Sequence, residues 1–80
     1  MLMIQLIDTT EDIGLTIRRT RKQLGVTQSD LALAAGTGLR FISELEKGKA
    51  TCQIGKVLLV LQVLNIQCNL SHPEVKSLGT

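Results

Sequence analysis

The sequence predicts an all-α fold: four to five short helices followed by one short C-terminal strand. Apolar residues recur at helical spacing in several windows of the chain, which is typical of amphipathic helices. Glycines follow these windows closely, and glycine readily ends a helix in the left-handed conformation. Phe41 is the only aromatic residue among 80. The core must therefore consist of aliphatic side chains, which suits helices packed against one another.

The chain of 80 residues is long enough for one domain. A domain this small buries only about 60% of its unfolded surface, and small chains often gain stability by forming oligomers. We expect an N-terminal arm at 1–12 with room for a short strand, a helical domain at 13–71 that ends in a dimerisation strand, and a flexible tail at 72–80. A dimer is the expected assembly.

Composition argues against several functional classes. No basic region precedes the apolar residues 1–7, so they are not a targeting signal. Apolar runs such as Val57–Leu61 are far shorter than the ~20 residues of a membrane helix. Cys52 and Cys68 match no metal or redox spacing, and a single histidine leaves little material for catalysis. We expect a cytoplasmic protein that is not an enzyme, binds no cofactor or metal and contacts no membrane.

Charge is distributed unevenly along the chain. The formal net charge is only +2. Residues 1–13 contain three acidic side chains and no basic one, whereas residues 14–56 contain eight basic and three acidic side chains. A basic segment within a helical domain indicates either a surface that attracts phosphate or an ordinary solvated face.

The first helix is predicted to begin at Thr9 or Thr10, where a capping hydroxyl precedes acidic residues that favour a helix N-terminus. Gly25 is expected to end it as a left-handed cap. Spacings of four, four and three residues define its inner face, which carries Ile13, Ile17, Arg21 and Leu24.

Two short helices follow, with a very short turn between them. Thr27 and Asp30 fit a capping box at the start of the second helix, and Gly36 is expected to end it. The third helix begins after the turn, with Thr37 or Gly38 as its cap. The inner faces are expected to carry Leu31, Ala34 and Ala35 in the second helix, and Ile42, Leu45 and Glu46 in the third.

The fourth helix is predicted from about Gln53 to Leu64, with Thr51 as its cap. It is apolar nearly all round, and a helix with two apolar faces has two surfaces to cover. One surface is the core of its own chain; the other is a second copy of the chain, unless burial in the core accounts for both. One stripe comprises Ile54, Val57, Leu58, Leu61 and Leu64, and the other Leu59, Val60 and Val63.

A period-two pattern follows this helix, with Ile66, Cys68 and Leu70 alternating with polar residues, which indicates a strand. One short strand is not stable alone. It must pair either with the N-terminal segment around Met3–Ile7 or with its twin in a dimer. The predicted dimer interface comprises Leu59, Val60, Val63, Ile66, Cys68 and Leu70.

Two short helices joined by a tight glycine-containing turn are typical of a helix-turn-helix. The strings LGVTQSDLA at 24–32, AGTG at 35–38 and ISELEKGK at 42–49 stand in order at matching separations. Over roughly residues 14–65 the chain resembles the Cro/cI (XRE) repressor family. The resemblance implies a lambda-repressor-like fold, a DNA-binding domain at 13–71 and a homodimer that occupies a two-fold operator in double-stranded DNA.

Arg21 and Glu46 are candidates for a structural ion pair. Both positions point inward from their predicted helices, and two buried opposite charges are favourable only if they meet. The resemblance implies such a bridge between the first and third helices. The alternative is two surface charges whose heads reach solvent.

The residues expected to contact base edges lie at the start of the third helix, where a helix-turn-helix meets the major groove. Arg40 matches the two acceptors of guanine, or else contacts phosphate alone. Leu39 suits a thymine methyl group. Glu44 either accepts from cytosine or is a solvated acid that rejects wrong sites. The full candidate set is Gly38, Leu39, Arg40, Ser43 and Glu44.

Four further residues are predicted to contact phosphates. Thr27 and Gln28 begin the second helix, where backbone amides and side chains can hold a phosphate. Lys47 and Lys49 follow the third helix and are expected to flank the DNA backbone. Phe41 lies next to the residues expected to contact base edges. It is interpreted either as a packing residue or as a contact with a partner or DNA.

A narrower resemblance is to HipB-type antitoxins. It rests on the apolar N-terminal segment, the string TIRRTRKQLGVTQSDLA at 16–32, the Leu/Val-rich fourth helix and the short strand at 66–70. It implies paired C-terminal strands, repression of the protein's own operon and a HipA-like Ser/Thr kinase toxin as partner. The alternatives are a phage or host repressor without a toxin, and a protein-interaction module that has lost DNA binding.

Overall fold

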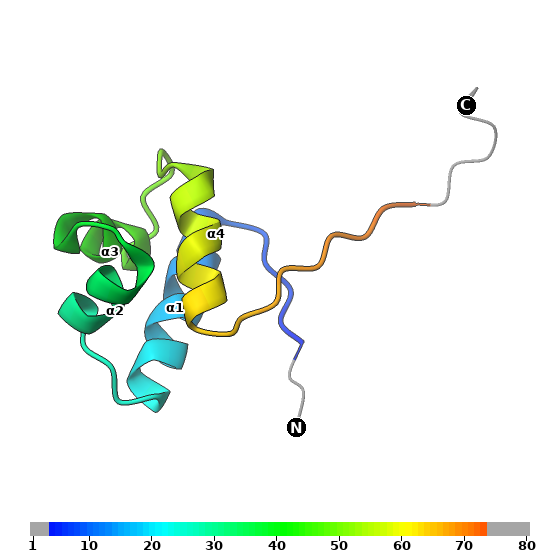
Figure 1. Cartoon of the computed structure of the whole chain (residues 1–80). Helices are drawn as coiled ribbons and strands as arrows, with labels where there is room; N and C mark the ends of the chain where they lie inside the picture. The colour runs from blue at the N-terminus through cyan, green and yellow to red at the C-terminus, as the bar shows by residue number, and fades with distance from the viewer. Residues whose placement is uncertain (1–3, 74–80) are drawn as a thin grey trace.

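Side-chain capping marks the start of the first two helices in the computed structural model, which describes residues 4–73. Within that range the chain forms α1 (Thr10–Gln23), α2 (Gln28–Ala35), α3 (Leu39–Glu46) and α4 (Ile54–Val63). Figure 1 shows α2 and α3 on one side of the molecule and both terminal segments leaving from the opposite side. None of the helices in the described range is long and apolar enough to cross a membrane.

Capping boxes begin α1 and α2. Thr9 and Thr27 each accept a hydrogen bond from the backbone N–H three residues later, and Asp12 and Asp30 bond back to the cap. Gly36 ends α2 at φ 70°, as the sequence predicts. The expected cap of α4 is wrong: residue 51 lies in a turn, and Gln53 takes the cap position without a side-chain bond.

The core contains one fully buried aliphatic side chain from each helix: Ile17, Leu31, Ile42 and Val60. Val57 and Leu64 join Val60 from α4, so this helix turns its 57/60/64 face inward. The assignment of Val60 to the dimer surface is therefore wrong, because its side chain is 0% exposed within its own chain.

Other positions also differ from the predicted inner faces. Ala32 is buried in α2, whereas Ala34 is exposed, because α2 packs on both α3 and α4 and so turns a different edge inward. Leu24 and Ile54 are exposed. Both stand at a helix end that extends beyond the core: Leu24 is the C-terminal cap of α1, and Ile54 is the first residue of α4.

The C-terminal segment leaves α4 through Asn65, which adopts a left-handed conformation at φ 58°. Ile66 then packs against the core, and its N–H donates to the Leu61 carbonyl at 2.8 Å. Residues 4–73 contain no strand, so the alternating segment is extended but unpaired in the single chain. Pairing with a second copy stays a prediction. Residues 1–3 and 74–80, which include most of the predicted tail, lie outside the described residues.

Candidate nucleic-acid interface

The turn between α2 and α3 connects two helices that pack against each other. The Thr37 N–H donates to the Ala32 carbonyl at 2.9 Å, which closes the last turn of α2. Gly38 is the cap of α3, one of the two predicted alternatives. Ile42 and Leu45 of α3 are buried, so the opposite face of the same helix must point outward.

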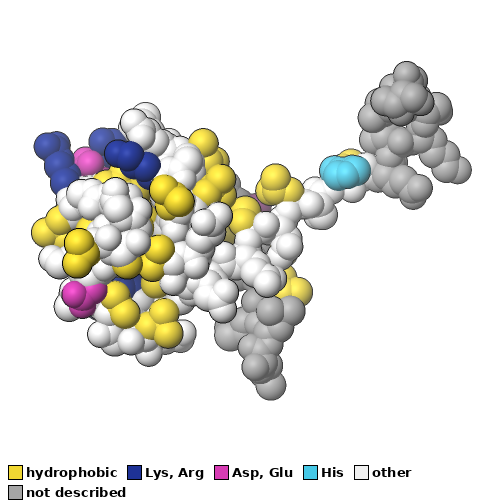
Figure 2. Space-filling model, viewed as in Figure 1, with side chains coloured by type: hydrophobic (Ala, Val, Ile, Leu, Met, Phe, Trp, Pro, Cys, Tyr) yellow, Lys and Arg dark blue, Asp and Glu magenta, His cyan; other side chains and the backbone are white. Residues whose placement is uncertain are grey.

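The outward face of α3 carries the predicted base-contacting residues together. Gly38, Leu39 and Arg40 are exposed, and the Arg40 side chain is 90% exposed. Ser43 and Glu44 lie one turn later and are half-buried. Figure 2 shows Lys and Arg side chains gathered at the end of the molecule where α3 lies, with acidic atoms among them.

Phe41 stands on the side of α3 that faces α4. Its ring packs against the core cluster, and the Lys56 Nζ lies 5.7 Å from the ring centroid. Of the two interpretations offered by the sequence, packing fits this position.

Two ion pairs connect the acid on this face to neighbouring cations. The Glu44 Oε1 lies 3.8 Å from the Arg40 Nε, one helical turn away. The Glu44 Oε2 lies 3.1 Å from the Lys49 Nζ in the segment that follows α3. A candidate base reader, Arg40, and a candidate phosphate contact, Lys49, are therefore joined through one carboxylate.

Arg21 and Glu46 form a bidentate ion pair behind the outward face of α3. The Arg21 Nε lies 2.6 Å from the Glu46 Oε2, and the Arg21 Nη2 donates to the Glu46 Oε1 at 3.0 Å. The Arg21 Nη1 also donates to the Val26 carbonyl at 2.9 Å. The Glu46 side chain is only 3% exposed. The pair therefore ties α1, the α1–α2 loop and α3 together.

The ionisation of this pair follows from its contacts. Burial by itself raises the pKa of the Glu46 carboxyl, but hydrogen bonds from Arg21 and Gln28 and the charge of Arg21 outweigh it. The pKa of Glu46 is therefore held below its usual value. The hydrogen bond to Glu46 raises the pKa of the Arg21 guanidinium, against the opposing effect of burial.

The N-terminus of α2 has less free hydrogen-bonding capacity than the sequence suggests. The Gln28 Nε2 donates to the Glu46 Oε1 at 3.0 Å, which uses one of its two amide hydrogens. The Thr27 oxygen accepts from the Asp30 N–H at 3.0 Å, which leaves its hydroxyl hydrogen for a phosphate.

An open hollow of about 440 Å³ lies where α1, α2 and α3 meet. Sequence reasoning missed two of its basic residues, Arg18 and Lys22, which stand one turn apart on the exposed surface of α1. The sequence does contain a signal for these two residues: they stand four positions apart within the basic run 18–22, which places them on the same side of a helix. The lining residues are Arg18, Arg21, Lys22, Gln28, Ser43, Glu46 and Lys47.

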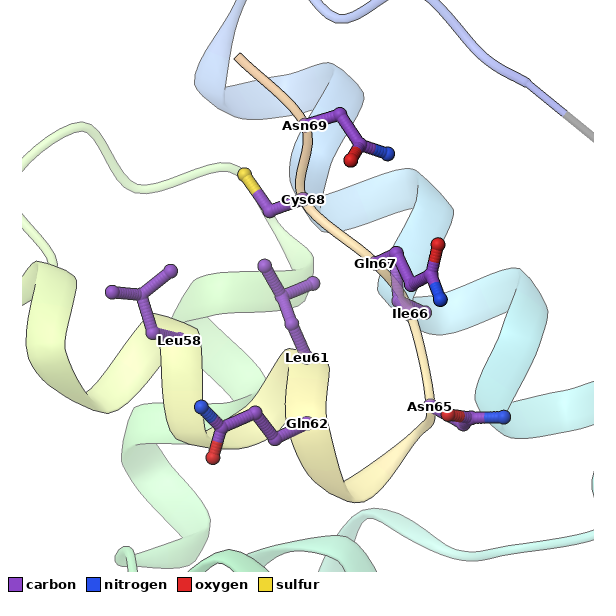
Figure 3. A pocket seen from close by; sticks show the side chains of 8 residues that line it. All are labelled: Leu58, Leu61, Gln62, Asn65, Ile66, Gln67, Cys68 and Asn69. Atoms are coloured by element: carbon purple, nitrogen blue, oxygen red, sulfur yellow. The ribbon is translucent and has the colours of Figure 1, made fainter.

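The predicted dimer residues divide into separate groups. Leu59 and Val63 of α4 are 47% and 42% exposed, whereas Ile66 is half-buried. Cys68 and Leu70 are exposed on the extended segment. Figure 3 shows Leu58 and Leu61 on α4 and Cys68 on that segment, all lining an open groove of about 630 Å³.

Comparisons with known proteins agree with this geometry. The family described as Helix-turn-helix matches residues 17–70. A relative from Sinorhizobium fredii (strain NBRC 101917 / NGR234), named "Uncharacterized HTH-type transcriptional regulator y4mF", is 49% identical over 71 residues, which cover 89% of this chain and 93% of the relative.

Two solved structures share the fold. One is described as "HipB-O4 20mer complex" and superimposes with a TM-score of 0.79 at 25% identity, covering 89% of this chain and 100% of that chain. The other is described as "Structure of HipA-HipB-O2-O3 complex", with a TM-score of 0.79, 25% identity and the same coverage of 89% and 100%.

Proposed function

Because this chain belongs to the helix-turn-helix family of transcriptional regulators and resembles the HipB antitoxins, we propose that it is a homodimeric repressor that reads an operator in the major groove. The observation that carries the proposal is the outward face of α3, where Leu39 and Arg40 are exposed beside a hollow lined by basic side chains. This combination supplies both base-contacting and phosphate-contacting groups on one surface.

Base reading is assigned to the start of α3. The planar guanidinium of Arg40 matches the O6 and N7 acceptors of guanine, a pairing worth ~1–3 kcal/mol of discrimination against a wrong base. Leu39 presents an apolar surface to a thymine methyl group. Ser43, one turn further along and half-buried, donates a hydroxyl to a base edge or to the adjacent phosphate.

Phosphate anchoring is assigned to residues on both sides of α3. Thr27 offers its hydroxyl hydrogen, and Gln28 offers its second amide hydrogen and its backbone N–H at the start of α2. Lys47 and Lys49 follow α3. Arg18 and Lys22 join this set because they line the same hollow as Lys47.

A second copy is proposed to cover the exposed apolar surface of α4. Leu58, Leu59 and Val63 are each partly exposed on this helix, and the extended segment adds Cys68 and Leu70. Pairing of the two C-terminal segments as strands would satisfy backbone groups that have no partner strand in the single chain. A two-fold dimer then places its two α3 helices about one turn of DNA, ~34 Å, apart.

The proposal extends to a toxin–antitoxin role in the cytoplasm. The fold is shared with HipB in a structure described as containing HipA and DNA, and this likeness supports a HipA-like Ser/Thr kinase toxin as partner. In that role the dimer represses its own operon and holds the toxin inactive. Co-purification with the product of an adjoining kinase-like gene tests this; a lone gene with no such partner favours a repressor without a toxin.

The experiment that tests DNA reading is a gel-shift titration with a duplex from upstream of the protein's own gene and a scrambled competitor. Arg40→Ala should weaken binding to the upstream duplex by about tenfold and leave the dimer mass unchanged. Arg19→Ala is the matched control, since this exposed arginine of α1 is outside the residues that line the hollow. An equal loss in both variants would show that Arg40 contributes only general positive charge.

A further inference from the structure

Glu44 is an acidic residue in the middle of a basic DNA-binding face. It lies on the same outward side of α3 as Arg40, and both of its carboxylate oxygens are close to cations. The Arg40 Nε stands 3.8 Å from one oxygen and the Lys49 Nζ 3.1 Å from the other. The side chains that the proposed function assigns to a base and to a phosphate are thus paired with an acid before DNA arrives.

These ion pairs contribute little to folding. Pairs between solvent-exposed side chains are generally weak, and an arginine four residues before a glutamate is the less favourable order on a helix. Arg40 is 90% exposed and reaches Glu44 only at 3.8 Å. Both cations can therefore leave Glu44 at small cost when another donor takes over its carboxylate.

DNA supplies acceptors for the two cations, but the same acceptors repel the Glu44 carboxylate. Phosphates and the O6, N7 and O4 atoms of base edges all repel Glu44, and in the major groove only the amino groups of cytosine and adenine can donate to it. Each cation lies within 4 Å of the Glu44 carboxylate, well inside the ~8 Å over which salt screens interactions at physiological ionic strength.

We propose that Glu44 is a specificity-determining residue that holds Arg40 and Lys49 back from non-operator DNA. At a site where a cytosine or adenine amino group takes over the carboxylate, Arg40 is released to its guanine and Lys49 to its phosphate. Elsewhere the carboxylate keeps part of the cationic charge neutralised, and non-specific binding stays weak. The inference rests on the proposed function, because it concerns the same face of α3.

The test compares the full chain with Glu44→Gln, which keeps the shape of the side chain and removes its charge. Binding to the upstream duplex and to a scrambled duplex of equal length is titrated at several salt concentrations. The variant should bind the scrambled duplex about tenfold more tightly and lose about tenfold in discrimination. Its slope of log affinity against log salt should steepen by about 0.9 for each cation released.

Two further variants connect the effect to this site. Asp8→Asn makes the same change in net charge at an exposed acid before α1 and should leave the discrimination ratio unchanged. Adding Arg40→Ala to Glu44→Gln should remove much of the gain on scrambled DNA. An equal gain in Asp8→Asn would attribute the effect to net charge and overturn the proposal.

The remaining outcomes separate this inference from the proposed function. If the wild type prefers the upstream duplex and Glu44→Gln weakens only that binding, the carboxylate is a direct base reader and no restraint exists. If the wild type shows no preference but Glu44→Gln still tightens scrambled binding, the restraint stands and the self-operator proposal falls. If neither protein binds DNA, both are overturned.

Discussion

At the scale of single residues, two glutamates two positions apart on α3 have opposite situations. Glu46 points inward and accepts three hydrogen bonds, two from Arg21 and one from Gln28. Glu44 points toward solvent and touches only exposed or half-exposed cations. Removing one partner of a buried pair leaves an uncompensated charge, whereas an exposed pair is readily replaced by water. The same substitution should therefore give very different results at these two positions.

Glu46→Gln should lower the free energy of unfolding by about 3–5 kcal/mol at neutral pH, because Arg21 loses its buried counter-charge. Glu44→Gln, the matched control, should lower it by less than about 1 kcal/mol. Urea denaturation followed by circular dichroism measures both. Similar losses in the two variants would mean that the Arg21–Glu46 pair is as weak as a surface pair.

The stability difference between wild type and Glu46→Gln should depend on pH. Because folding lowers the pKa of Glu46, the pair contributes stability above the ordinary carboxyl pKa, and this contribution disappears as pH falls through the lower pKa of the folded state. The two proteins should therefore converge in stability at acidic pH, in denaturation series run across that range. A constant difference down to acidic pH would contradict the depressed pKa.

At the scale of elements, the junction of α1 with the end of α3 depends on a glycine. A Cβ built on Gly14 would stand 2.8 Å from the carbonyl oxygen of Glu46, and backbone cannot move aside as a flexible side chain can. The same junction is closed by the Thr10 hydroxyl, which donates to the Gly48 carbonyl at 2.8 Å. Close helix packing at this point sets the position of α3 relative to α1, and with it the position of the outward face of α3.

Gly14→Ala should destabilise the protein by about 1–3 kcal/mol, the usual cost of forcing an atom into a packed contact. Gly55→Ala is the matched control: this glycine is also helical, a Cβ there meets nothing within 4 Å, and alanine should stabilise α4 by roughly 0.5–1 kcal/mol. Thermal melts of the two variants should shift in opposite directions. A shift in the same direction would show that α1 can move away from α3 at little cost.

At the scale of the whole molecule, α4 has two apolar surfaces, one in the core and one exposed to solvent. Val60 is fully buried within the core, whereas Leu59 and Val63 of the same helix are 47% and 42% exposed. Helix α3, whose outward face is proposed to bind DNA, lies on the side of the molecule opposite the terminal segments (Figure 1). The proposed dimer, built on α4, would leave the α3 helices of both copies accessible.

Leu59→Asp should dissociate the proposed dimer while the helical content of the chain is retained, because a charge at an apolar interface costs free energy only when the two copies associate. Leu33→Asp is the control, since Leu33 is exposed on α2, away from the proposed interface. Sedimentation velocity over a range of concentrations measures the effect. A Leu59→Asp protein that remains a dimer would show that another surface joins the copies.

The local features of this protein could be predicted from its amino-acid sequence alone. The capping boxes at Thr9 and Thr27 and the left-handed Gly36 depend on interactions within a few residues, and these can be read from the sequence. The inward positions of Arg21 and Glu46 followed from helical periodicity. The three-dimensional structure was needed to show which edge of α4 enters the core, because a helix that is apolar all round carries no periodic signal to orient it. The structure was also needed to show that Gln28 bonds to Glu46, because this contact depends on how separate helices pack. The same holds for Glu44, which joins Arg40 to Lys49, because this link depends on the path of the chain after α3.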